Sequence, residues 1–211
     1  MGLKVVEVKC TDAKINLQDI QEKLAQYFCS AFLYQNPGGY FAEQPMKEIY
    51  ELCLKQGCLV ILDVSGAIGT KQCAGKFADI MIGSFGEGKL VNAKGGGFIS
   101  YKEEALFNQL KLEKLKDEPQ LEIIYAQLRQ LPQRIKFLSE KVKKIRQDLK
   151  DFAVVHPGDL GFVAVVKYKS DEEKSKIISY CKQNSLPFTE CPRYIRLKQP
   201  AISIEVKQLE E

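Results

Sequence analysis

A glycine-rich stretch between two apolar runs constrains the fold of this chain more than any other part of the sequence. The run Ile80–Ile82 leads into the segment Gly83–Gly88, and a second glycine run, Gly95–Gly97, precedes the apolar pair Phe98–Ile99. Glycine accepts a positive φ and leaves room where a side chain would block a close approach. The pattern therefore predicts a strand, two tight loops with Lys89 between them, and another strand, so that the backbone can approach a ligand closely.

Three interpretations of Lys89 fit this stretch. The spacing of Gly83, Gly88 and Lys89 matches a phosphate-cradling loop, but Leu90 stands where that motif needs a magnesium-binding hydroxyl. The glycine-rich residues that follow also cannot sustain the helix that this motif usually opens. Alternatively, Lys89 is an amine nucleophile that forms a Schiff base with a carbonyl cofactor. The simplest alternative is a solvated lysine on a glycine-rich turn, and the residues upstream decide against it.

A carboxylate upstream favours the Schiff-base interpretation. Asp63 follows the most apolar strand-like run of the chain, Cys58–Leu62. A carboxylate at the end of a buried strand is costly unless it meets a cation or a strong donor, and ligands bind at that end of the strands in open α/β sheets. Pyridoxal 5'-phosphate (PLP) chemistry requires an Asp that keeps the pyridine nitrogen protonated and a Lys that carries the aldehyde. As an alternative, Asp63 caps the turn or helix that follows it.

The region 31–100 resembles the core of a fold-type I PLP-dependent transferase, and it is most similar to the DegT/DnrJ/EryC1/StrS aminotransferases. The resemblance is carried by three segments: Leu62–Gly69, Ser84–Lys89 and Asn92–Ser100. By this resemblance, Asp63 is the partner of the pyridine nitrogen and Lys89 is the Schiff-base lysine. The resemblance implies PLP as cofactor and a small amine or amino acid as substrate.

The resemblance also implies further contacts to the cofactor. Ser84 and Asn36 are candidate cofactor-binding residues, although Asn36 lies in a turn sequence that favours asparagine for its own sake. Relatives usually carry a Gln three residues after the Asp, whereas this chain has Gly66. A side-chain contact to the ring is therefore lost, or it is made by Ser65 or by another residue.

In this family a C-terminal domain closes over the substrate. We expect the segment Tyr194–Leu197 to be a strand of that domain, and Arg196 within it resembles an arginine that pairs with a substrate carboxylate. The planar guanidinium suits such a bidentate contact. The alternative is an exposed strand arginine without a role in binding.

The order of the expected elements predicts an α/β fold. Strands and helices alternate up to Ser100, which favours a mostly parallel sheet with right-handed crossovers. We expect a partial large domain of the aspartate aminotransferase type at 1–116, a connecting helical segment at 117–150 and a small α+β C-terminal domain at 151–211. The expected strands outside the glycine-rich stretch are Leu3–Val8, Ala31–Tyr34, Cys58–Leu62, Gly161–Tyr168, Tyr194–Leu197 and Ala201–Val206. The expected helices are one that starts at Asn16 with a stripe through Ile20, Leu24 and Phe28, and those at Gln44–Gln56, Leu106–Leu115 and Asp171–Gln183.

A further apolar stripe predicts one long helix in the middle of the chain. Its members are spaced alternately by three and four residues: Leu121, Ile124, Leu128, Leu131, Ile135, Leu138, Val142, Ile145 and Leu149. Pro132 should kink this helix or split it in two. The stripe is either a coiled-coil contact with another chain or, as the resemblance implies and as we prefer, the helix that connects the large and small domains.

The composition excludes several classes of site. The seven cysteines are scattered and form no C-x-x-C pair, which argues for reduced thiols in a cytoplasm and against disulfides or a zinc site. A single histidine, His156, excludes a multi-histidine metal site. No apolar run is long enough to predict a membrane span. The formal net charge of +4 does not by itself imply a nucleic-acid partner.

Taken together, these features predict an aminotransferase-like PLP-dependent transferase whose site needs another chain. The resemblance covers nearly all of this chain but only the later part of such an enzyme, because the helix N-terminus that holds the cofactor phosphate and the aromatic ring that stacks on the cofactor are not identifiable. We therefore expect a truncated form that a companion chain, or a second copy in a homodimer, completes. The alternative is a non-catalytic subunit or scaffold that keeps the fold and binds no cofactor.

Overall fold

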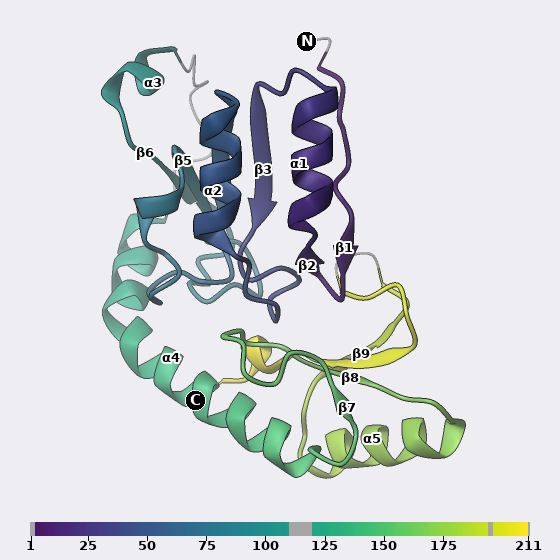
Figure 1. The fold of residues 1–211 in the computed structure, drawn as a ribbon. Coiled ribbons are helices and arrows are strands. Elements are labelled where there is room, and N and C mark those ends of the chain that lie inside the picture. Colours follow the sequence, from purple (N-terminus) through teal and green to yellow (C-terminus); the bar gives the residue numbers. More distant parts are fainter. Residues whose placement is uncertain (1–2, 110–119, 194–195, 211) are drawn as a thin grey trace.

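The upper half of the molecule is built on a four-stranded sheet (Figure 1). The computed structural model describes residues 3–109, 120–193 and 196–210. The strands of this sheet are, in their order across it, β3 (Ala31–Gln35), β4 (Leu59–Asp63), β5 (Ile80–Ser84) and β6 (Gly97–Tyr101). β3, β4 and β5 run parallel, whereas β6 pairs with β5 in the antiparallel direction. The predicted α/β fold with a mostly parallel sheet is confirmed, and an antiparallel edge strand is common in such sheets.

Two helices, α1 (Leu17–Gln26) and α2 (Met46–Lys55), are seen on either side of β3 in Figure 1, and a 3-10 turn, η1 (Gly75–Phe77), precedes β5. α1 begins as predicted, because the Asn16 side chain accepts a hydrogen bond from a backbone N–H of the first turn. Leu24 is buried, but Phe28, the expected third member of the stripe, lies beyond the helix and is 96% exposed. The apolar stripe of α1 is therefore shorter than the sequence indicated.

The segment before α1 differs from the prediction. Leu3–Val8 belongs to no strand, and the first strands are the short antiparallel pair β1 (Cys10–Thr11) and β2 (Lys14–Ile15). Leu3 and Val5 are 78% and 84% exposed. Apolar side chains form a strand only where a neighbouring strand and a packing surface receive them. Val8 packs partly against the core, but among the described residues no strand pairs with Leu3–Val8.

A single long helix, α4 (Leu121–Asp148), links the two halves of the molecule in Figure 1. It continues through Pro132, which is exposed, so the alternative of a helix split in two is wrong. The stripe buries its later members and leaves Leu121 and Leu128 exposed. A shorter helix, α3 (Glu104–Gln109), precedes it. Most of the predicted helix Leu106–Leu115 lies outside the described residues.

The lower half contains a second, antiparallel sheet. Its strands are, in their order across it, β7 (Ala153–Val154), β8 (Ala164–Lys167), β10 (Ala201–Ile204) and β9 (Phe188–Cys191). Helix α5 (Asp171–Gln183) packs on it through Ile177 and Cys181, and a 3-10 turn, η2 (Val206–Gln208), follows β10. The predicted strand Tyr194–Leu197 is wrong, because Arg196 and Leu197 belong to no strand; the first two of its residues lie outside the described residues.

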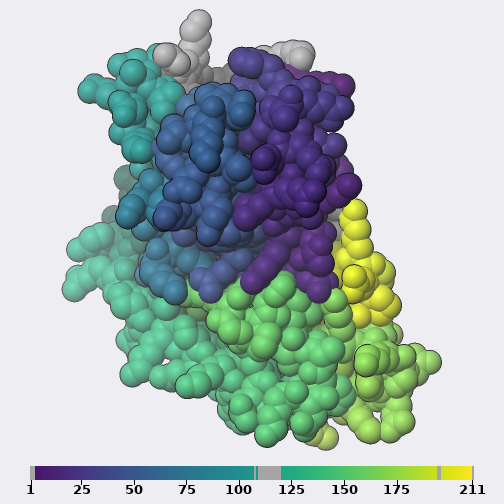
Figure 2. Space-filling model, in the orientation of Figure 1, coloured from purple at the N-terminus to yellow at the C-terminus, as the bar shows by residue number. Residues whose placement is uncertain are grey.

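The two halves pack directly against each other. In the space-filling view the N-terminal half, purple to blue, lies on the green C-terminal half (Figure 2). One cluster of buried apolar side chains contains residues from the first sheet, from α4 and from the second sheet. Among the described helices, none has the length and apolarity needed to cross a membrane.

Candidate functional site

The carboxyl ends of β3, β4 and β5 lie next to one another, and backbone hydrogen bonds connect the loops that leave them. The N–H of Asn36 donates to the carbonyl of Asp63 at 3.0 Å, and the N–H of Val64 donates to the carbonyl of Ile82 at 2.9 Å. Parallel strands bring their carboxyl ends to one edge, where open α/β sheets bind ligands. Asn36 and Asp63, two residues predicted from the sequence, therefore meet at this edge.

The predicted residues Asp63, Ser65 and Ser84 form a chain of local contacts. Asp63 is half-buried, and its Oδ1 accepts a hydrogen bond from the backbone N–H of Ser65 at 2.8 Å. The buried Ser65 hydroxyl in turn accepts one from the backbone N–H of Ser84 at 3.0 Å. One oxygen of Asp63 therefore caps the turn that follows the strand, as the alternative interpretation predicted. The other, Oδ2, has no hydrogen-bond donor among the described residues.

Asn36 carries a buried amide that is only half satisfied. Its side chain is 1% exposed, and its Oδ1 accepts a hydrogen bond from the backbone N–H of Gln44 at 2.9 Å. Its Nδ2 is buried and has no hydrogen-bond partner in the described part of the chain. An unsatisfied buried donor costs about 1–3 kcal/mol. A ligand acceptor at this edge would remove that cost.

The amine of Lys89 contacts Tyr40, a residue of the loop that follows β3. The Nζ atom donates to the Tyr40 hydroxyl and lies 5.0 Å from the centroid of the ring. Gly66 makes room for this ring, since a Cβ at Gly66 would lie 2.7 Å from the Tyr40 Cδ1 atom. At Gly66, where the resemblance leads us to expect Gln, the space for a side chain is thus occupied by Tyr40.

Three cations surround the Tyr40 ring. Besides Lys89, the guanidinium carbon of Arg196 and the Nζ atom of Lys207 each lie 5.2 Å from its centroid. Lys207 Nζ also donates to the carbonyl of Gly88 at 3.0 Å, directly beside Lys89. Burial lowers the pKa of Lys207; Glu205 raises it, and the charges of Arg196 and Lys89 lower it further. The surroundings of Lys89 are therefore strongly cationic.

A single buried carboxylate balances part of this charge. Glu205 Oε2 lies 2.6 Å from Arg196 Nη2, and both side chains are 2% exposed. Ser203 donates its hydroxyl to Glu205 Oε1 at 2.9 Å, and Lys207 Nζ lies 3.8 Å from Oε2. Arg196, predicted to hold a substrate carboxylate, thus already faces a carboxylate of its own chain. The substrate role of Arg196 stays a prediction, and it requires Glu205 to release the guanidinium.

The predicted residues form two groups. Asn36, Asp63 and the two serines lie at the strand edge, whereas Lys89 and Arg196 meet at Tyr40. Lys89 and Asp63 form no ion pair with each other in the described part of the chain. Sequence reasoning missed Tyr40, Glu205 and Lys207. For Glu205 a signal existed, because it is a lone carboxylate at the end of an apolar run.

The loop after β5 does not have the structure of a nucleotide-binding loop, and the described residues contain no metal-binding cluster. After β5 the chain runs through turns and enters β6, so the helix that a phosphate-cradling loop opens is missing, as the residues after Lys89 predicted. The described residues contain no group of three or more His, Cys, Asp or Glu side chains that could hold a metal ion.

Comparison with family models identifies the chain. The model of the DegT/DnrJ/EryC1/StrS aminotransferase family matches residues 2–117, which is more than half of the sequence. The chain belongs to this family. A second model, the MJ1341 family C-terminal domain, matches residues 131–211. A search among curated proteins finds no match.

Several solved structures share this fold, and they include a palmitoyltransferase and aminotransferases. Serine palmitoyltransferase from S. paucimobilis, solved with bound PLP, has a TM-score of 0.67 at 13% identity, over 92% of this chain and 55% of that chain. The aminotransferase TlmJ from Streptoalloteichus hindustanus has a TM-score of 0.64 at 17% identity, over 86% and 62%. Alanine–glyoxylate aminotransferase from Nostoc sp. has a TM-score of 0.64 at 12% identity, over 92% and 60%. At these identities the likeness shows the fold, and this chain spans only 55% to 62% of the length of those structures.

Proposed function

We propose that this member of the aminotransferase family supplies the lysine and the aspartate of a PLP site that acts on a small amine or amino acid. The observation that carries the proposal is the contact of the Lys89 amine with the hydroxyl of Tyr40, which holds this amine in the loop that follows β5. Family membership and the fold shared with PLP-dependent transferases support it. A companion chain, or a second copy of this chain in a homodimer, completes the site.

The residues at the strand edge fit PLP. Asn36 Nδ2 is a buried donor without a partner, and Asp63 Oδ2 is an acceptor without a donor among the described residues. When bound, PLP supplies an aldehyde that condenses with amines and a pyridine ring that withdraws electrons from the adduct. A neutral hydrogen-bonding group and a carboxylate are what the ring of such a cofactor needs from its protein.

Each residue has a distinct task in the proposed site. Lys89 would hold the aldehyde of PLP through its Nζ atom, and the same amine would move a proton as a general base. Asp63 holds the proton on the pyridine nitrogen. Ser65 and Ser84 keep the two strand ends in register, and Arg196, after release from Glu205, pairs with a substrate carboxylate.

The proposal includes a domain organisation and a location. In it, the chain consists of a partial large domain at 1–116, a connecting segment at 117–150 and a small domain at 151–211. The cytoplasm is its proposed location, because its seven cysteines suit a reducing compartment.

The test is an absorption spectrum with added PLP, before and after borohydride, followed by mass mapping of the labelled lysine. It is run on the purified chain and on the chain together with any protein that co-purifies with it. We expect a visible band that borohydride removes, with the label on Lys89. The label should disappear in Lys89→Ala and persist in Lys94→Ala, a control in which an exposed lysine of the same loop is changed.

The competing function is a non-catalytic subunit that keeps the fold. It is favoured by the fact that Lys89 and Arg196 both already have partners, Tyr40 and Glu205. A label on another lysine, or no band and no label in either preparation, would refute the PLP site and leave this function in its place.

A further inference from the structure

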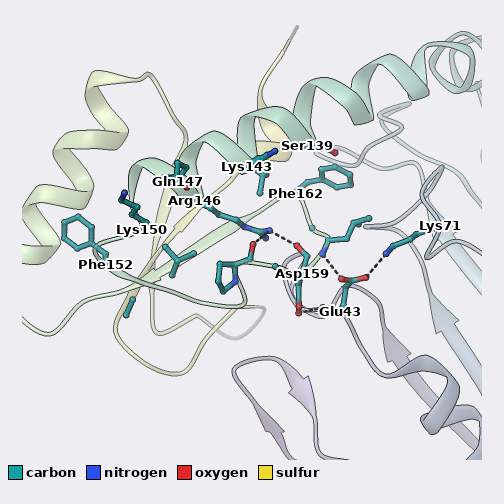
Figure 3. A pocket seen from close by; sticks show the side chains of 17 residues that line it. Glu43, Lys71, Ser139, Lys143, Arg146, Gln147, Lys150, Phe152, Asp159 and Phe162 are labelled. Carbon is teal, nitrogen blue, oxygen red and sulfur yellow. Dashed lines mark hydrogen bonds and ion pairs between the residues drawn. The ribbon is translucent and has the colours of Figure 1, made fainter.

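A cleft of about 600 Å³ lies between the later part of α4 and the segment 152–162 (Figure 3). None of the residues predicted for the PLP site lines it. Its charged lining residues are four cations and two carboxylates: Lys71, Lys143, Arg146, Lys150, Glu43 and Asp159. Cations thus outnumber carboxylates on its walls.

Both carboxylates are already engaged on the far wall. Glu43 Oε2 accepts a hydrogen bond from the N–H of Leu160 at 2.9 Å, and its Oε1 lies 4.0 Å from Lys71 Nζ. Asp159 Oδ2 pairs with Lys14 at 2.9 Å and accepts a hydrogen bond from the N–H of Glu43 at 3.0 Å. The dashed lines in Figure 3 show the contacts of Glu43 on this wall. Both carboxylates thus have partners on this wall, and among the described residues neither forms an ion pair with Lys143, Arg146 or Lys150.

Arg146 is the cation of α4 that points into this region, and half of its guanidinium is unsatisfied. Its Nη1 donates to the carbonyls of Pro157 and Asp159, at 3.1 and 2.6 Å. Its Nε and Nη2 are buried, and neither has a hydrogen-bond partner among the described residues. Burial lowers the pKa of this guanidinium, against the opposing charges of Asp159 and Glu43. Buried donors without partners are rare in folded proteins, and each calls for an explanation.

The two unsatisfied nitrogens form one edge of the guanidinium. The N–H groups of Nε and Nη2 are parallel, and this edge is the one that binds both oxygens of a carboxylate or a phosphate side-on. Lys143 and Lys150 stand on the same wall, are exposed, and form no ion pair in the described part of the chain. A bidentate donor edge in a cleft that two exposed ammonium groups also line is suited to an oxyanion.

We propose that this cleft binds a small molecule through a carboxylate or phosphate group, held by the Nε–Nη2 edge of Arg146, with Lys143 and Lys150 as additional cationic contacts. Because Nε and Nη2 are both buried in this structure, the proposed binding requires the Arg146 side chain to turn that edge toward the cleft. The site is separate from the proposed PLP site and does not depend on it.

The test is calorimetric titration of the full chain with inorganic phosphate and, separately, with citrate, each against sodium chloride at matched ionic strength. We expect saturable binding of at least one oxyanion; the two titrations show whether the site prefers phosphate or carboxylate. Arg146→Lys keeps the charge and removes the fork, so it should weaken binding by about tenfold or more, since a charge-assisted hydrogen bond contributes about 1.5–3 kcal/mol. Lys136→Gln, an exposed change on α4 outside the cleft, should leave the affinity unchanged.

A melting curve in phosphate-free buffer will show whether Arg146→Lys folds. If it does not fold, a second variant still tests the proposal. The double variant Lys143→Gln, Lys150→Gln changes only exposed side chains and should weaken binding and its dependence on salt. Binding that both variants leave unchanged would overturn the proposal. So would the lack of saturable binding of either oxyanion up to about 10 mM, the range of very weak ligands.

Discussion

The buried ion pair between Arg196 and Glu205 lies beside the loop that carries Lys89, and its energetic weight can be measured directly. Its closest atoms are 2.6 Å apart, and both side chains are 2% exposed. Glu205→Gln keeps the shape of the side chain and removes its charge, so that Arg196 and Lys207 face a neutral amide. Breaking a buried pair in this way costs about 3–5 kcal/mol. Since about 1 kcal/mol shifts the Tm of a domain of this size by roughly 2–4 °C, the Tm should fall by about 6–20 °C.

A second ion pair of the same length provides the control. Lys176 and Glu172 also approach to 2.6 Å, but their side chains are 61% and 77% exposed. Glu172→Gln should therefore leave the Tm unchanged within error, because solvent screens exposed pairs. Unfolding is followed by far-UV circular dichroism, since the chain has no tryptophan. Equal shifts for Glu205→Gln and Glu172→Gln would refute the reasoning that burial, and not bond length, sets the cost.

The same variant has a defined pH dependence. Burial alone would raise the pKa of Glu205, but the hydrogen bond and charge of Arg196, with Ser203 and Lys207, lower it below its ordinary value of 4.5. A carboxylate whose pKa is lower in the folded state stabilises the fold above its unfolded pKa and loses that contribution as the pH falls through the folded pKa. The difference in unfolding free energy between wild type and Glu205→Gln should therefore be constant near neutral pH and shrink below pH 4.5. A difference that widens on acidification would contradict this assignment.

Two further changes probe the packing. Gly66→Ala places a Cβ 2.7 Å from Tyr40 Cδ1; we expect a loss of about 1–3 kcal/mol in urea unfolding from overpacking, together with a changed NMR shift of the Lys89 side chain. Leu138 is fully buried in α4 and Leu128 is 41% exposed. Leu138→Ala should therefore cost about 2–5 kcal/mol and Leu128→Ala less than about 1 kcal/mol in the same assay; similar losses would show that the stripe is not buried as described.

The parallel sheet was predictable because its signals are local. Its strands are continuous apolar runs, and the intervening helices carry readable limits, such as Asn16 at the start of α1 and Gly57 after α2. The failures, Leu3–Val8 and Tyr194–Leu197, also have apolar patterns. A pattern does not say whether a neighbouring strand is present. β9, by contrast, forms from the weakly patterned Phe188–Cys191 because β10 pairs with it along its length.

The candidate site likewise contains residues that the sequence signals and residues that only the tertiary packing places. Asp63 and Lys89 stand out in the sequence, since each follows a strand-like run at a position where ligands bind. Tyr40 and Glu205 could not be placed. Tyr40 meets Lys89 through the course of the loop after β3, and Glu205 comes near this loop only through its partner Arg196, because the C-terminal half packs on it. Glu205 still illustrates what a lone carboxylate after a buried strand implies, which is a cation close by. That cation is Arg196, the arginine that by its sequence context is predicted to bind a substrate carboxylate.

The C-terminal half touches both loops that hold the Lys89 amine in place. The N–H of Phe162 donates to the carbonyl of Tyr40 at 3.0 Å, and Lys207 Nζ donates to the carbonyl of Gly88 at 3.0 Å. These two contacts are joined, since the N–H of Lys207 donates to the carbonyl of Phe162 at 2.8 Å. The approach is so close that a Cβ at Gly161 would lie 2.5 Å from the carbonyl oxygen of Tyr40. Because the same backbone links both loops, a movement of the C-terminal half would shift the tyrosine that binds the Lys89 amine and the carbonyl beside it together.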